Sequence, residues 1–269
     1  YIHRLDPRTK LIMVVLYIVA LFMAKSWLGY GLVIAFLAMC IKISSIPLKS
    51  ITRGLKPVML IVVFTGVLNL FFTPGTHEIF TIFGFTLTWE AVERAAQMIL
   101  RIMLLITGTF LLTYTTSPIS LTDGLESLMN PLKKIKVPVH EFAMMMTIAL
   151  RFIPLLVEET DKIMNAQKSR GADFSNGSLI DRAKALIPLL IPLFVSSFKR
   201  AEELATAMEC RCYRGDKNRT KLVKLEYKAM DFIWMLAFVL VFAIVIVLRT
   251  LPYTVEITSP LFRIFFYKI

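Results

Sequence analysis

Two arginines, Arg170 and Arg211, stand at matching positions near the ends of two long amphipathic patterns. The first pattern ends in Ala166-Gln167-Lys168-Ser169-Arg170 and the second in Ala207-Met208-Glu209-Cys210-Arg211. A guanidinium is planar and permanently charged, so it pairs well with carboxylates and backbone carbonyls of another surface. A cation in the last turn of a helix also interacts favourably with the helix dipole, so capping is the simpler interpretation. The repeated Ala-x-x-x-Arg pattern favours a shared binding role.

Long helices must position these two side chains. Apolar residues recur at i, i+3 and i+4 over 139–170 and again over 179–211, which predicts an apolar stripe along each of two helices. A helix of about 30 residues, at about 1.5 Å per residue, is roughly 45 Å long. We expect Pro154, Pro188 and Pro192 to bend these helices, because proline removes an amide donor.

The composition excludes an ordinary soluble domain. Of the 269 residues, 57% are hydrophobic and 19% are charged, and the mean hydropathy is +0.68. These values are typical of a multi-pass protein embedded in a lipid bilayer. The net charge of +12 is compatible with nucleic acid, an anionic membrane face or acidic partners. In a membrane protein the position of the charges matters more than their sum, and we expect no nucleic-acid partner.

Five apolar segments predict transmembrane helices. They lie at 11–24, 27–41, 57–72, 95–114 and 232–248. Asp6 followed by Pro7 is typical of a helix start and predicts where the first one begins. The loop after the second segment is basic, which places that loop and the N-terminus in the cytoplasm, whereas the acidic loop at 73–93 belongs outside.

We therefore predict an all-α integral membrane protein with about five transmembrane helices and a cytoplasmic coupling domain that contains two long crossing amphipathic helices. Residues 1–115 would form a membrane domain with four spans, residues 116–230 the coupling domain, and residues 231–269 the fifth span and an external aromatic tail. The apolar run at 185–198 is too short to span a bilayer, so we expect it to be buried against protein or to lie at the membrane surface.

Arg101 interrupts the fourth predicted span and shares a helical face with Glu90, Arg94 and Gln97. An arginine within a bilayer is costly unless it is paired or reaches the interface. Two interpretations stay open. Arg101 either extends outward to the interface, or it contacts a partner membrane subunit or one of the acids Glu90 and Glu93.

The motifs of an enzyme are missing from the sequence. No segment matches the phosphate-binding pattern Gly-x-x-x-x-Gly-Lys-Ser/Thr. His3, His77 and His140 are too scattered for a metal site or a catalytic triad, and we expect them in loops or at the surface. The pairs Glu158-Glu159 and Glu202-Glu203 are expected to face solvent. We therefore expect no catalytic residue, metal or cofactor in this chain.

Several motifs occur in an order that resembles the T component of energy-coupling factor (ECF) transporters, bacterial importers of vitamins and metal ions in the ABC class. They are His3-Arg4-Leu5-Asp6-Pro7-Arg8-Thr9-Lys10-Leu11, Ala149-Leu150-Arg151-Phe152-Ile153-Pro154, Ser169-Arg170-Gly171-Ala172-Asp173, Arg200-Ala201-Glu202-Glu203-Leu204-Ala205 and Ala207-Met208-Glu209-Cys210-Arg211-Cys212-Tyr213. The family usually reads Ala-Arg-Gly at both helix ends, whereas this chain reads Ser-Arg-Gly and Cys-Arg-Cys.

The resemblance implies a non-catalytic scaffold subunit in the bacterial cell membrane. It implies two homologous ABC ATPase subunits that bind ATP and Mg, and a membrane S component, either dedicated or interchangeable, that binds the vitamin or micronutrient. The residues that it assigns to ATPase coupling are Ser169, Arg170, Gly171, Cys210, Arg211 and Cys212. We expect the S component to contact an apolar surface that comprises Phe142, Met145, Met146, Phe152, Leu186, Leu190 and Phe194.

Two other classes are weighed against this interpretation. A membrane enzyme that acts on anionic lipid headgroups could use the basic residues of 133–151, but no acids, histidines or metal motif cluster there. A self-sufficient secondary carrier would have inverted repeats with broken spans in both halves, and no such symmetry is visible. The sequence does not identify the transported substrate.

Overall fold

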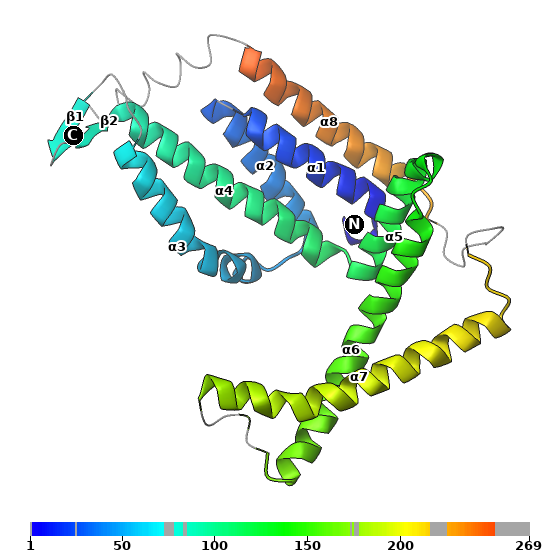
Figure 1. The fold of residues 1–269 in the computed structure, drawn as a ribbon. Helices are drawn as coiled ribbons and strands as arrows, with labels where there is room; N and C mark the ends of the chain where they lie inside the picture. The colour runs from blue at the N-terminus through cyan, green and yellow to red at the C-terminus, as the bar shows by residue number, and fades with distance from the viewer. Residues whose placement is uncertain are drawn as a thin grey trace. The chain divides into compact units, whose positions relative to one another are not determined.

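The computed structural model describes residues 2–24, 26–72, 78–82, 85–172, 174, 178–215 and 225–250. Over these residues the fold is helical apart from one short β-hairpin, which confirms the predicted helical membrane fold (Figure 1). The chain divides into two compact units. The first comprises Tyr1–Gly124 with Leu225–Ile269, and the second comprises Leu125–Lys224.

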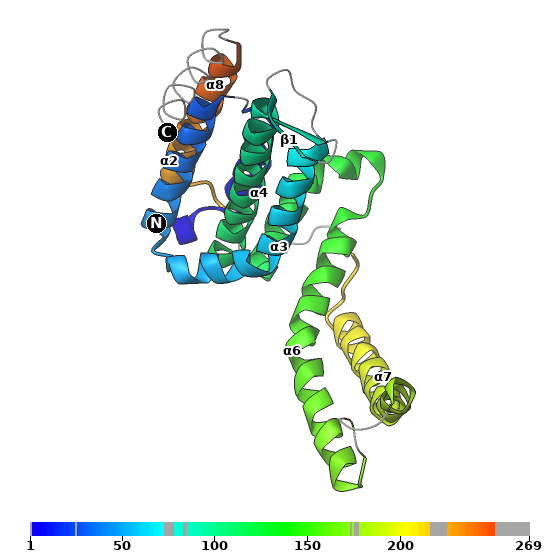
Figure 2. The ribbon, with the colours of Figure 1, turned by 90° about the vertical axis from the view of Figure 1, so that its left-hand side faces the viewer.

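The first unit is built mainly from long helices. Its elements are η1 (Ile2–Arg4), α1 (Pro7–Met23), α2 (Trp27–Ser44), α3 (Leu48–Phe72), β1 (Glu78–Ile82), β2 (Phe85–Thr88), α4 (Trp89–Thr115), the start of α5 (Pro118–Met129) and α8 (Ala229–Thr250). α1 packs against α4 and α8, α2 packs against α8, and α3 packs along α4 (Figure 2). This packing buries an apolar core that includes Tyr17, Leu21, Tyr30, Leu104 and Phe238.

The segment between the third and fourth spans, predicted to be an external loop, contains the hairpin. β1 and β2 pair antiparallel, with Thr81 opposite Thr86 and Ile82 opposite Phe85. The β-branched and aromatic residues in both strands favour this conformation.

Five described helices are long and apolar enough to cross a membrane, which is the predicted number. They are α2, α3, α4, α6 and α8, so the set differs from the prediction by one member. α1 has 17 residues, slightly fewer than the roughly 20 that a straight span requires. α6 (Val139–Ser169) qualifies because its first part, 139–157, contains only two charged side chains, Glu141 and Arg151.

The starts of α1 and α8 are joined by buried polar contacts. Asp6 caps α1 as predicted, since its carboxylate accepts a hydrogen bond from the Arg8 backbone N–H at 2.9 Å and Pro7 follows it. Asp231, which is 1% exposed, accepts the backbone N–H groups of Asp6 and of Lys228, each at 2.8 Å. Because α1 and α8 begin together and pack against each other, they run in the same direction.

The second unit is dominated by two helices that cross (Figure 1). It contains the end of α5, η2 (Asn130–Ile135), α6 and α7 (Leu179–Cys210). The predicted helices at 139–170 and 179–211 are therefore confirmed to within one residue at each end. Both helices continue through their prolines. They are joined by an ion pair between Glu159 and Arg200 at 3.1 Å.

Two expectations for single side chains were wrong. Glu159 does not simply face solvent, because it forms the partly buried ion pair with Arg200. His140 does not lie at the surface: it is 7% exposed, and its Nδ1 lies 3.0 Å from Oε1 of Glu126. Burial strengthens the electrostatic attraction between such groups, but it also removes both from water, which offsets part of the gain. Sequence spacing did not reveal either contact, because both partners lie on a different helix.

His3 is exposed, and its Nε2 lies 3.1 Å from the Ser44 carbonyl oxygen. Within the ranges that the structure describes, no three potential ligands gather into a metal site. The predictions for His77 and for the aromatic tail after residue 250 fall outside the described residues.

Candidate functional site

Arg170 stands at the C-cap of α6, where the backbone closes the helix in a Schellman motif. The Ala172 N–H donates to the Gln167 carbonyl at 3.0 Å, and the Gly171 N–H donates to the Lys168 carbonyl at 2.9 Å. Gly171 adopts a φ of 89°, the left-handed conformation that this motif requires. The turn satisfies carbonyls that would otherwise be unpaired at the helix end.

Arg211 occupies the same position in the same motif at the end of α7. The Tyr213 N–H donates to the Met208 carbonyl at 3.0 Å, and the Cys212 N–H donates to the Glu209 carbonyl at 2.8 Å. Cys212 takes the left-handed place with a φ of 56°. A residue other than glycine is uncommon in this conformation. The two ends are therefore equivalent in backbone structure although their sequences differ around the arginine.

The six residues predicted for coupling are all exposed. Neither guanidinium has a hydrogen bond or an ion pair within the described part of the chain. Glu159 and Arg200 form an ion pair between the helices. Arg170 follows Glu159 by eleven residues in α6, and Arg211 follows Arg200 by eleven residues in α7. At about 1.5 Å per residue, each arginine is roughly 16 Å along its helix from this contact.

The two helices cross in opposite directions, so Arg170 and Arg211 lie on opposite sides of the crossing. Gln167 near the end of α6 donates to the Pro188 carbonyl in the first part of α7 at 3.5 Å. At the other side of the crossing, residues of the first half of α6 meet the end of α7 in a groove of about 680 Å³. Its lining includes Arg151, Arg211 and Arg214, of which only Arg211 was predicted as a functional residue. The family motifs around Arg151 and Arg211 were the signals in the sequence that pointed to this groove.

The predicted apolar contact residues are mostly exposed. Phe142 is 59% exposed, Met145 and Met146 are each 54% exposed, and Phe194 is 62% exposed. Leu186 and Leu190 are exposed as well, whereas Phe152 is half-buried. The structure does not bring these residues into one patch. The residues from α6 lie on one side of the α6–α7 crossing, and the residues from α7 lie on the other side.

Of the two alternatives predicted for the apolar run at 185–198, burial against other described residues of this chain is not seen. A position at the membrane surface stays a prediction. Leu189 is buried, but Ile187, Ile191, Val195 and Phe198 are exposed. Large apolar side chains that are exposed along two helices mark a surface for lipid or protein. The site thus combines two free guanidinium groups at the helix ends with an apolar surface along the same helices.

Arg101 of α4 is held by groups of its own unit. Its Nε and Nη2 donate to the Tyr30 hydroxyl at 3.0 and 2.7 Å, and Nη2 also donates to the Ala24 carbonyl at 3.4 Å. Pairing with Glu90 or Glu93, which was part of one open alternative, is not seen among the described residues. Contact with a partner membrane subunit stays a prediction. The guanidinium extends toward the end of α1 and the start of α2, the direction expected for a side chain that reaches toward the membrane interface.

Comparison with known proteins places this geometry in a family. The model of the CbiQ family, described as a cobalt transport protein, matches residues 1–222. The chain belongs to this family. Its relatives include proteins named energy-coupling factor transporter transmembrane protein EcfT. The protein from Ruminiclostridium cellulolyticum is 52% identical over 231 residues, which cover 86% of each chain. The protein from Bacillus subtilis is 47% identical over 248 residues, which cover 92% of this chain and 94% of the relative.

As a member of the CbiQ family with relatives of this kind, the chain is a transmembrane component of an energy-coupling factor transporter. The resemblance inferred from the motifs is confirmed. The membrane location follows from the same relatives and from the five long apolar helices.

Proposed function

We propose that this chain is the scaffold that couples two cytosolic ABC ATPases to a substrate-binding membrane S component in an ECF importer of a vitamin or micronutrient. Arg170 docks with one ATPase and Arg211 with the other. Residues 116–230 form the coupling domain on the cytoplasmic side. The proposal extends the family assignment to a mechanism.

One observation carries this proposal. Arg170 and Arg211 occupy the same position of the same helix-ending motif, both are exposed, and neither has a partner among the described residues. Two equivalent, unpaired guanidinium groups suit two homologous partners. Capping alone would not require both helices to place an arginine at the identical position of the turn.

Docking of a guanidinium in a partner groove is favourable where the groove supplies carboxylates or backbone carbonyls. The planar fork makes two parallel hydrogen bonds to a carboxylate, which fixes the orientation as well as the position. The equivalent turns place both guanidinium groups at the ends of rigid helices. When the ATPases close on ATP, each docked end moves with its ATPase.

The crossing of α6 and α7 transmits this movement. The Glu159–Arg200 ion pair joins the helices midway between the two arginines, so a displacement of one end turns one helix against the other. The exposed apolar segments of α6 and α7 on both sides of the crossing then move against the S component. Their methionines, including Met145 and Met146, are flexible enough to fit different partners. ATP and Mg are bound by the ATPase chains.

The experiment replaces Arg170 and Arg211 by alanine, singly and together, in the assembled transporter. We expect each single change to weaken copurification of an ATPase or to uncouple ATP hydrolysis from uptake, and the double change to abolish uptake into proteoliposomes. Charge reversal to glutamate should be more severe, because repulsion replaces attraction at a desolvated contact. Lys168→Ala and Lys199→Ala, at exposed cations of the same two helices, are the matched controls and should behave as wild type.

The conservative change to lysine separates docking from capping. Lysine retains the favourable interaction with the helix dipole but lacks the planar fork, so docking predicts impaired transport for Arg170→Lys with Arg211→Lys, and capping predicts none. Wild-type uptake and ATPase copurification in the double alanine variant would defeat the proposal.

A further inference from the structure

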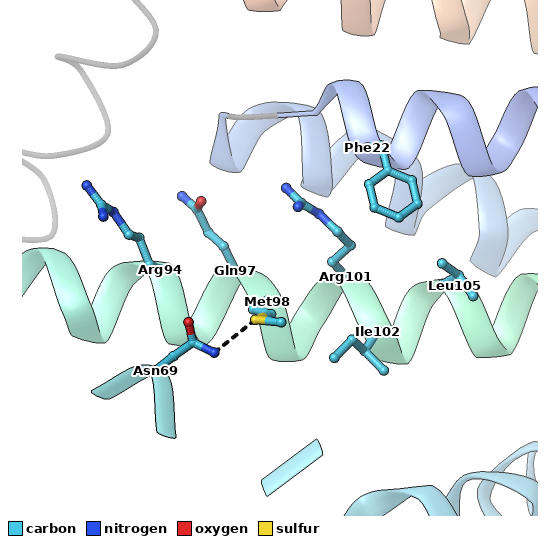
Figure 3. Close-up of a pocket in the computed structure, with 8 residues that line it drawn as sticks. All are labelled: Phe22, Asn69, Arg94, Gln97, Met98, Arg101, Ile102 and Leu105. Atoms are coloured by element: carbon cyan, nitrogen blue, oxygen red, sulfur yellow. Dashed lines mark hydrogen bonds between the residues drawn. The ribbon is translucent and has the colours of Figure 1, made fainter. Parts of the chain in front are cut away.

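A pocket of about 460 Å³ opens between α1, α3 and α4 of the first unit (Figure 3). Its lining is formed by Phe22, Asn69, Arg94, Gln97, Met98, Arg101, Ile102 and Leu105. None of these residues belongs to the helices that carry the proposed coupling function. The proposed coupling function therefore does not account for this pocket.

Three polar side chains of α4 point in the same direction along the pocket. Arg94, Gln97 and Arg101 follow at intervals of three and four residues, and Figure 3 shows them on the same side of the helix. Arg94 is exposed and has no hydrogen bond or ion pair within the described residues. Two guanidinium groups with a neutral amide between them make this wall of the pocket positively charged.

The guanidinium of Arg101 is held in place, but not all of its hydrogen-bond donors are used. The described hydrogen bonds of its guanidinium use Nε and Nη2, and Nη1 has none. The ring of Phe22 lies 5.7 Å and the ring of Tyr30 lies 5.9 Å from its central carbon, which adds two cation–π contacts. A guanidinium has five N–H donors, so this arrangement orients Arg101 and leaves donors for a ligand.

Two acids, Glu90 and Glu93, lie at the start of α4, and neither belongs to the lining of the pocket. Oε1 of Glu93 accepts hydrogen bonds from the Trp27 indole at 3.0 Å and from Gln97 at 3.3 Å. The arginines are therefore available to an anion from outside the chain.

The pocket changes from polar to apolar along the bundle. It lies where α1 and α3 end and α4 begins, and Asn69 and Arg94 mark this end of the helices. Toward the middle of α4 the lining becomes apolar, with Ile102 and Leu105. A charged end near the membrane interface with an apolar continuation into the bilayer matches one class of molecule, a phospholipid with its phosphate outward and its acyl chain inward.

We propose that this pocket binds an anionic phospholipid, with the headgroup phosphate between Arg94 and the free Nη1 of Arg101 and an acyl chain along Ile102 and Leu105. The lipid would occupy the space between α3 and α4 on one side and α1 on the other. Basic pockets between transmembrane helices are a known physical solution for headgroup binding. This inference is independent of the coupling mechanism proposed above.

The test uses the purified protein, delipidated in detergent and incubated with either phosphatidylglycerol or phosphatidylcholine. Native mass spectrometry measures the fraction of protein that retains lipid. We expect phosphatidylglycerol to be retained in preference to phosphatidylcholine, and Arg94→Gln to weaken its retention about fivefold. Because Arg94 is exposed and unbonded within the described residues, this variant should fold normally, which its unfolding temperature will verify.

Arg249→Gln is the matched control. Arg249 is an exposed arginine in the last turn of α8, which runs in the same direction as α1, so it lies toward the same end of the bundle but outside the pocket. Its replacement should leave lipid retention unchanged. Equal effects of the two variants would mean that general surface charge, not the pocket, holds the lipid.

Three further results would overturn the proposal. Equal retention of the two lipids would exclude headgroup selection. Displacement of phosphatidylglycerol by an equal concentration of soluble glycerol phosphate would show that phosphate alone is the ligand. If Arg94→Gln leaves lipid retention intact but prevents copurification of a partner membrane protein, the pocket serves a protein contact.

Discussion

Glu159 and Arg200 form an ion pair at 3.1 Å where α6 and α7 meet, and each lies eleven residues before the arginine at the end of its helix. The contact therefore joins equivalent positions of the two helices. Their side chains are 27% and 31% exposed, so water weakens the attraction only in part. This arrangement places the two proposed docking ends at equal distances from the crossing.

Breaking this ion pair should affect coupling more than stability. Glu159→Gln or Arg200→Gln is expected to lower the free energy of unfolding by no more than about 1 kcal/mol, as for other partly exposed pairs. ATP-driven uptake should fall further, because the crossing would lose its one described ion pair. Thermal unfolding and uptake are measured for both single variants and for the exchange Glu159→Arg with Arg200→Glu. The exchange should recover part of the uptake. Equal losses of uptake in the exchange and single variants would exclude a role for the pair.

The helix-ending turns predict opposite responses to substitution. Gly171→Ala places a side chain on a φ of 89° and should destabilise the end of α6 by about 1 kcal/mol. Cys212→Gly removes a side chain from a φ of 56° and should not destabilise the end of α7. Amide hydrogen exchange at each helix end measures both effects. Faster exchange near residue 212 in Cys212→Gly would contradict the shared turn geometry.

Asp231 should be essential for the stability of the first unit. Asp231→Ala leaves the buried Asp6 N–H and the partly buried Lys228 N–H without their acceptor, and the loss at a buried group typically costs about 1 to 3 kcal/mol. Asp231→Asn keeps one acceptor oxygen and should be less severe. The unfolding temperature in detergent is the measurement, with Glu226→Ala at a nearby exposed acid as the control. A control as unstable as Asp231→Ala would refute this account.

Gly108 permits close packing of α4 against α1. A Cβ at this position would overlap the Tyr17 ring, which is held in place by a hydrogen bond from its hydroxyl to the Leu104 carbonyl at 2.8 Å. Gly108→Ala should therefore destabilise the bundle by about 1 to 3 kcal/mol. Gly31→Ala is the control, because a Cβ there meets nothing within 4 Å. The pair is compared by thermal unfolding, and similar behaviour of both variants would show that the α1–α4 contact tolerates a methyl group.

Local patterns in the sequence were sufficient to predict most of the helices. The cap formed by Asp6 and Pro7, the apolar periodicity of α6 and α7, and the arginines at their ends depend on residues within a few positions of each other. For that reason the predicted bounds of α6 and α7 agree with the structure to within one residue. The ordered motifs likewise led to the correct family.

Contacts between distant segments required the tertiary structure. Nothing near Glu159 or His140 in sequence indicates that Arg200 or Glu126 is its partner, and the same holds for Arg101 and Tyr30. The φ of Cys212 was equally hidden, because cysteine rarely adopts a left-handed conformation and only the closing hydrogen bonds of the turn reveal it. Helical periodicity determines which face of a helix is apolar. Which face meets which neighbour depends on how all the helices pack at once, and that packing alone decided these pairings.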